Sequence, residues 1–195
     1  RLGNLGNVLG QSPSQTEVLL FESPVLSNRD FARLRAHVGE GAVEIDCTFQ
    51  AAGETLRSAL NRIRGEAEDA VRQGRAHIVL SDANVGPKRA PVPMILAAGG
   101  VHSHLVSEGL RTFTSLHVRS GECLDVHICA VLIGVGATTL TPYLAEETIV
   151  ERCARGLFPG LTVDQACACY RAAVDQGLLK VISKMGISVI SSYRG

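Results

Sequence analysis

Histidines and cysteines at short spacings are the first candidates for chemistry in this sequence. Cys123 and His127 are four residues apart, so on a helix they would share a face, and both residue types bind zinc. No further ligand stands at the spacing of a zinc site, which favours a packed thiol beside a hydrogen-bonded histidine. His102 and His104 would point about 200° apart on a helix, which disfavours a shared metal.

Other motifs for catalysis or cofactor binding are missing from the sequence. Cys167 and Cys169 are two residues apart, which fits neither a CxxC redox pair nor a zinc knuckle, so we expect both to fill the core. The glycines lack the GxGxxG and GxxxxGK spacings that bind phosphates, and no GxSxG elbow is present. The sequence therefore predicts no catalytic, cofactor-binding or metal-binding residue in this chain.

Polar residues that follow predicted strands are the remaining candidates, because function in α/β proteins collects at those positions. They are Ser81, Asp82, Ser120, Gly121 and Glu122. The same residue types also cap helices, which is their more frequent role. A site around Asp82 and Glu122 is the alternative hypothesis, in which the chain is a stand-alone (β/α)-type enzyme or small-molecule-binding protein.

Strand and helix patterns alternate along the chain. The apolar periods predict strands at 43–49, 76–80, 113–118 and 138–141, and helices at 27–38, 56–73, 94–108, 122–133 and 162–177. Such repeats imply an α/β fold with a parallel sheet, either open or part of a (β/α) barrel, since four strands cannot close an eight-stranded barrel. We expect an entry loop or strap at 1–22, a single α/β domain at 23–177 and a C-terminal segment at 178–195.

Composition excludes several partners. Nineteen basic residues balance nineteen acidic ones, which indicates neither nucleic acid nor an anionic membrane as a partner. The apolar runs are far shorter than the roughly 20 residues of a membrane-spanning helix. The six cysteines lie mostly in apolar stretches, so we expect a reducing, cytoplasmic location. The chain opens at Arg1 rather than at a methionine, which is typical of a piece of a longer protein.

Several strings of residues occur in the order that one known family shows. They include residues 22–28 (ESPVLSN), 80–82 (LSD), 90–94 (APVPM) and 101–105 (VHSHL). These strings resemble the central domain of glutamate synthase. The most specific are residues 177–188 (GLLKVISKMGIS) and 192–195 (SYRG), which are similar to the segment before the family's FMN-binding domain. Typical members carry polar residues or a tyrosine where this chain has Ser103, Leu124, Ile128 and Val135, so it is a divergent member.

The resemblance implies a role in glutamate biosynthesis. The whole enzyme would be an oxidoreductase that takes nitrogen from glutamine, passes ammonia to 2-oxoglutarate and uses FMN and an iron–sulfur cluster. This stretch would be its noncatalytic connecting domain, with the glutamine amidotransferase and FMN-binding domains as partners. The residues that select the electron donor, NADPH, NADH or ferredoxin, would lie outside this stretch.

The resemblance also implies residues that face other domains or the ammonia route. The candidates are His102, His104, Arg111, His127, Lys184, Ser192 and Tyr193. Surfaces that meet other domains are expected to show apolar patches, mainly over residues 178–190.

Overall fold

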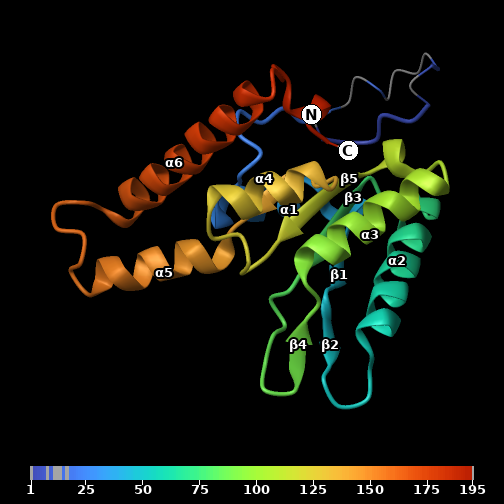
Figure 1. Ribbon diagram of the computed structural model, residues 1–195, viewed down its shortest axis with the longest axis horizontal. Coiled ribbons are helices and arrows are strands. Elements are labelled where there is room, and N and C mark those ends of the chain that lie inside the picture. The colour runs from blue at the N-terminus through green and yellow to red at the C-terminus, as the bar shows by residue number, and fades with distance from the viewer. Residues whose placement is uncertain (1, 8, 11–14, 16–17, 195) are drawn as a thin grey trace.

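A four-stranded parallel sheet organises the molecule (Figure 1). The computed structural model describes residues 2–7, 9, 10, 15 and 18–194. The sheet order is β1 (Ala42–Asp46), β3 (His77–Ser81), β5 (Ser115–Arg119) and β6 (Thr139–Thr141). Helices α2 (Leu56–Arg72), α3 (Met94–Ser107) and α4 (Val126–Gly134) connect consecutive strands. Each strand of this sheet therefore pairs with the sheet's next strand along the chain, as in an arc of a (β/α) barrel, and the predicted fold class is confirmed.

Buried apolar side chains on the sheet and its helices form one main core. Every residue of β3 is buried, as predicted for a strand covered on both faces. Helix α2 turns Ala59, Ile63 and Ala67 inward at spacings of four, and all three are fully enclosed. The sheet and its three crossover helices thus form the rigid unit that positions the polar groups at both sheet ends.

The start of the chain contacts this sheet at two places, along its β6 edge and at its amino end. Leu26 N–H donates to the Leu140 carbonyl at 2.8 Å, and residues 24–26 so run beside β6 before α1 (Asn28–Val38) begins. Further upstream, Gly3 N–H donates to Ser115 Oγ at 2.9 Å, at the first residue of β5. The described part of the predicted strap therefore crosses the amino end of the sheet, while residues 1, 8, 11–14, 16 and 17 lie outside the described residues.

The strand predicted at 43–49 is two strands. Strand β1 ends at Asp46, whose carboxylate accepts hydrogen bonds from Thr48 N–H at 2.9 Å and Thr48 Oγ at 2.7 Å. This local turn directs β2 (Thr48–Gln50) away from the main sheet. Strand β2 pairs antiparallel with β4 (Arg89–Pro91), which lies in a stretch predicted to be a loop.

The helix predicted to stop at Gly177 continues to Lys184. Helix α6 (Val163–Lys184) begins with the predicted capping box of Thr162 and Gln165. A Cβ on Gly177 would lie 2.4 Å from Val126 Cγ2. Gly177 is therefore needed for the close crossing of α6 over α4, and residues 178–184 continue the last helix of the domain.

The helix predicted at 122–133 begins four residues later, because Asp125 caps it by accepting Ile128 N–H at 2.9 Å. Cys123 thus precedes α4 and does not share a helical face with His127. Its thiol lies instead against the buried Cys129, and this contact and burial raise the pKa of Cys123. The prediction that Cys169 fills the core is also wrong, since it is exposed.

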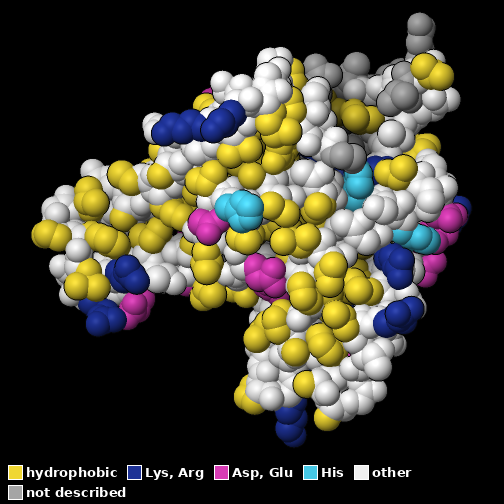
Figure 2. Space-filling model, in the orientation of Figure 1, with side chains coloured by type: hydrophobic (Ala, Val, Ile, Leu, Met, Phe, Trp, Pro, Cys, Tyr) yellow, Lys and Arg dark blue, Asp and Glu magenta, His cyan; other side chains and the backbone are white. Residues whose placement is uncertain are grey.

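Helices α5 (Tyr143–Ala154) and α6 form an arm that extends away from the sheet (Figure 1). Apolar side chains gather along this arm on the face drawn in Figure 2. Within residues 178–190, where exposed apolar patches were predicted, Leu179, Met185 and Val189 are 61%, 61% and 55% exposed. The arm itself adds exposed apolar residues that the sequence did not indicate, among them Leu144, Val150, Leu157, Leu161 and Val163. No helix in the described ranges is long and apolar enough to cross a membrane.

Candidate functional site

Asp82 lies buried at the carboxyl end of the sheet, and its carboxylate oxygens accept hydrogen bonds from other residues of the chain. It is 3% exposed and accepts hydrogen bonds from Ser120 Oγ at 2.6 Å and Gly121 N–H at 3.1 Å. The Tyr143 hydroxyl also bonds to Asp82, and burial, followed by the Asp82 charge, raises the pKa of Tyr143 to about 12. Asp82 therefore joins the loops after β3, β5 and β6 into one internal network.

The other acids at this end also serve the fold. Glu122 Oε2 accepts the N–H of Met94 at 3.1 Å and so caps α3, which has no side-chain cap of its own. Asp46 Oδ2 accepts Arg89 Nη2 at 2.7 Å and Asn84 Nδ2 at 3.2 Å. Neither Asp82 nor Glu122 lines the largest cavity or four smaller ones found elsewhere among the described residues. Of the residues expected to cap helices, Glu122 caps α3, whereas Asp82 joins loops instead.

At the amino end, Arg111 lies at the centre of a different group. It belongs to the short helix η3 (Arg111–Phe113) and donates to three neutral acceptors: His102 Nδ1 at 3.0 Å, the Thr114 carbonyl at 2.7 Å and the Gly136 carbonyl at 2.8 Å. Burial, followed by the charge of Arg194, lowers the pKa of Arg111 to about 10. A Cβ on Gly136 would lie 2.3 Å from the His102 ring, so only glycine allows this approach.

Tyr193 joins the same region from the far end of the chain. After α6 the chain passes through η4 (Ile190–Ser192), and the Tyr193 ring would lie 3.5 Å from a Cβ on Gly134, the last residue of α4. Gly134 is two residues from the Gly136 that binds Arg111. The structure thus brings together three of the seven predicted residues, His102, Arg111 and Tyr193.

The other four predicted residues lie apart from this group. His104 Nε2 is 2.7 Å from Glu68 Oε2 and ties α3 to α2. His127, Lys184 and Ser192 are exposed, and none makes a side-chain hydrogen bond or ion pair within the described part of the chain.

Two buried histidines that the sequence did not single out cross the sheet near its amino end. His77 Nδ1 lies 3.0 Å from His117 Nε2, and His117 Nδ1 lies 2.6 Å from Thr139 Oγ. Burial, followed by the charges of His77, Arg35 and Arg111, lowers the pKa of His117 to about 3. Both rings are thus neutral at pH 7 and share one row of hydrogen bonds. The available signal was a histidine beside apolar residues in each of two strands.

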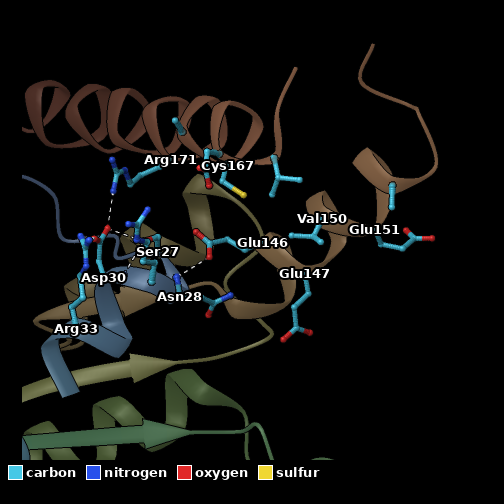
Figure 3. A pocket seen from close by; sticks show the side chains of 15 residues that line it. Ser27, Asn28, Asp30, Arg33, Glu146, Glu147, Val150, Glu151, Cys167 and Arg171 are labelled. Carbon is cyan, nitrogen blue, oxygen red and sulfur yellow. Dashed lines mark hydrogen bonds and ion pairs between the residues drawn. The ribbon is translucent and has the colours of Figure 1, made fainter. Parts of the chain in front are cut away.

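The largest cavity, about 660 Å³, lies between α1, α5 and α6 (Figure 3). Glu146 points from α5 toward the start of α1 and accepts Asn28 N–H at 2.7 Å. Arg171 of α6 pairs with Asp30 at 3.1 Å. The polar groups in this cavity therefore hold the three helices together. Its acidic side chains come from all three helices, and its basic side chains come from α1 and α6.

Comparison with known proteins identifies the family. The model of the glutamate synthase central domain matches residues 1–195. The chain belongs to this family. It is 57% identical to the glutamate synthase [NADPH] large chain of Azospirillum brasilense and 38% identical to the chloroplastic ferredoxin-dependent glutamate synthase of Spinacia oleracea. Each match covers 100% of this chain but only 13% of the relative.

A solved structure supports the barrel-like arrangement. A mutant flavocytochrome b2 with pyruvate bound matches with a TM-score of 0.50 at 13% identity, over 85% of this chain and 49% of that one. At this identity the likeness shows the fold alone.

The cofactors that the family resemblance implies for a whole glutamate synthase do not fit the described residues. No group of three His, Cys, Asp or Glu side chains among them is arranged to hold a metal. A flavin phosphate needs free donors after a strand, but after β5 the Gly121 N–H already donates to the buried Asp82 carboxylate. No reaction step is therefore assigned to an FMN or an iron–sulfur cluster within this chain.

Proposed function

We propose that this chain is the noncatalytic central domain of a glutamate synthase. It joins the glutamine amidotransferase domain to the FMN-binding domain and helps to wall the route of ammonia between them. The observation that carries this proposal is the match of the whole chain to the central-domain family, within relatives of which it spans 13%. The whole protein then acts as an oxidoreductase that makes glutamate from glutamine and 2-oxoglutarate.

The use of polar groups at the carboxyl end of the sheet supports a noncatalytic role. Enzymes with (β/α) folds place reacting side chains there. In this chain Asp82 and Glu122 instead hold loops and cap a helix. The alternative of a stand-alone enzyme or small-molecule-binding protein at Asp82 and Glu122 would require these side chains to face an open site.

The exposed apolar residues support contact with further domains. They lie along the α5–α6 arm and on the segment after Leu178, far from the fully enclosed core around β3. Surface patches of this kind mark protein–protein contacts. In a longer glutamate synthase chain, neighbouring domains would cover them.

The proposal is tested in a full-length glutamate synthase that carries this sequence, by the coupling between glutamine hydrolysis and the consumption of 2-oxoglutarate. We expect Lys184→Ala and His127→Ala to raise the glutamine consumed per 2-oxoglutarate consumed, because ammonia escapes when the domain contacts loosen. Lys88→Ala, at an exposed lysine outside the candidate set, is the matched control and should leave the ratio unchanged. The proposal fails if residues 1–195, expressed alone, bind FMN stoichiometrically or hydrolyse glutamine.

A further inference from the structure

Arg194 lies in a place where its charge is only partly solvated. The Tyr193 ring packs beside Gly134 and anchors the end of the chain at the amino end of the sheet, near the first strap residues (Figure 1). The Nε–H of Arg194 is enclosed and has no hydrogen-bond partner. No ion pair to Arg194 is found among the described residues.

Arg111 adds a second cation to this place. All of its hydrogen-bond partners are neutral: an imidazole nitrogen, two carbonyls and the Thr138 hydroxyl at 3.4 Å. None of the described carboxylates pairs with it. Tyr193, the residue before Arg194, packs beside Gly134, two residues from the Gly136 whose carbonyl Arg111 binds. Burial lowers the pKa of Arg194, and the charge of Arg194 lowers the pKa of Arg111.

This arrangement is costly unless an anion completes it. A partly buried charge without an ion-pair partner is destabilising, and a second like charge nearby adds to the cost. A guanidinium presents a planar fork of donors that matches the two oxygens of a carboxylate or a phosphate. Arg111 is fixed by three hydrogen bonds, and Arg194 remains half-buried with donors to spare. The two side chains therefore offer one fixed and one adaptable half of an anion site.

We propose that Arg111 and Arg194 together bind one oxyanion at the amino end of the sheet. The oxyanion is either a carboxylate side chain from another part of a longer glutamate synthase chain or a free anion of the phosphate type. Arg194 supplies the fork, and Arg111 supplies positive charge held in place by His102 and Gly136. This site does not depend on the ammonia route.

The sign of a stability change tests the site in the full-length protein. Arg194→Met keeps most of the aliphatic length and removes the charge. If an oxyanion is bound, the midpoint of thermal unfolding falls, by about 2–4 °C for each kcal/mol lost from a domain of this size. If Arg194 stays unpaired, the substitution removes a buried charge, and an unchanged or higher midpoint overturns the proposal. Arg57→Met is the control, because Arg57 is exposed and has no described ion pair.

Replacing chloride by phosphate at constant ionic strength distinguishes the two sources. A wild-type midpoint that rises in phosphate, with no rise in Arg194→Met, identifies a free anion. A wild-type midpoint that does not respond, together with the fall in Arg194→Met, identifies a carboxylate of the same protein. If Arg194→Met does not fold, Arg194→Lys is measured instead. A lower midpoint of thermal unfolding supports bidentate binding of the oxyanion by the Arg194 guanidinium, and an equal or higher midpoint overturns the proposal. Loss of the site would leave the coupling test of the proposed function unaffected.

Discussion

At the carboxyl end of the sheet, acidic side chains meet hydrogen-bond donors of their own chain, whereas at the amino end two arginines lie among neutral acceptors. Asp82 and Glu122 each accept a hydrogen bond from a backbone N–H of the same chain, and both side chains serve to hold the fold. Arg111 has only neutral partners, and the Nε of Arg194 has none. The two ends thus differ in whether their buried polar atoms all find hydrogen-bond partners among the described residues.

This difference indicates which end contacts other groups. Enzymes built on (β/α) units work at the carboxyl end, where loops bring side chains from several strands together. Here the loops also meet, but they bind one another through Asp82 and Tyr143. The buried donor without a partner lies at the opposite end, so a group that accepts its hydrogen bond is expected there rather than at the usual site.

The largest expected effect is at the amino end, where Gly136→Ala should destabilise the fold by about 4 kcal/mol. The reason is the sum of left-handed backbone strain, about 1–2 kcal/mol, and overpacking, about 1–3 kcal/mol. Gly136 has φ 115°, and its new Cβ would meet the His102 ring. The measurement is the free energy of unfolding in urea.

Gly74→Ala is the control for this substitution, because Gly74 has φ 85° and no heavy atom within 4 Å of a new Cβ. It should cost only the backbone strain. Equal losses at both glycines would show that His102 does not pack against Gly136 as described.

At the carboxyl end, Asp82→Ala should cost about 3 kcal/mol, because buried donors lose their acceptor. Ser120 Oγ–H, Gly121 N–H and the Tyr143 hydroxyl would all be left unpaired. Asp82→Asn should cost less, since one oxygen remains. Urea unfolding measures both, and Asp69→Ala, at an exposed position of α2, should change stability by under about 0.5 kcal/mol. A loss at Asp82 no larger than at Asp69 would mean that the carboxyl end is open after all.

The hydrogen-bonded row of His77, His117 and Thr139 makes the stability of the amino end sensitive to acid. The folded pKa of His117, about 3, lies below its ordinary value of 6.5, so its contribution to stability is present above pH 6.5 and is lost as the pH falls. At pH 5 the loss is about 2 kcal/mol. His117→Gln should flatten the dependence between pH 7 and pH 5, while His127→Gln, at an exposed histidine, should not. A slope that survives in His117→Gln would place the acid sensitivity elsewhere.

The sequence predicted the strands, the crossover helices and the parallel sheet because each is encoded locally. Ser27 and Thr162 each cap the helix that follows, as their spacing to later residues indicates. The misses come from contacts between distant segments. Gly177 has the local character of a helix stop, but its lack of a side chain serves the crossing with Val126.

The candidate site was predicted only in part, for the same reason. Family motifs pointed to His102, Arg111 and Tyr193, which the fold brings together from α3, η3 and the end of the chain. They also pointed to His104, whose position two residues from His102 places it on a different face of α3, against Glu68. The pairing of His77 with His117 depends on strand register, which a single sequence does not reveal.

The smallest expected effect concerns Glu122, which caps α3 from the other side of the carboxyl end. Glu122→Ala should cost about 1 kcal/mol, because the Met94 N–H loses its acceptor. Glu122→Gln keeps an acceptor oxygen and loses the charge. Burial raises the folded pKa of Glu122 above its ordinary value, so the wild type gives up stability as the pH rises through that folded pKa. Glu122→Gln should therefore match or exceed the wild type in urea unfolding at pH 7 and lose that advantage at pH 4. An advantage that grows toward pH 4 would show that attraction between the carboxylate and the start of α3 outweighs burial, and that this end of the sheet, too, holds a charge that matters.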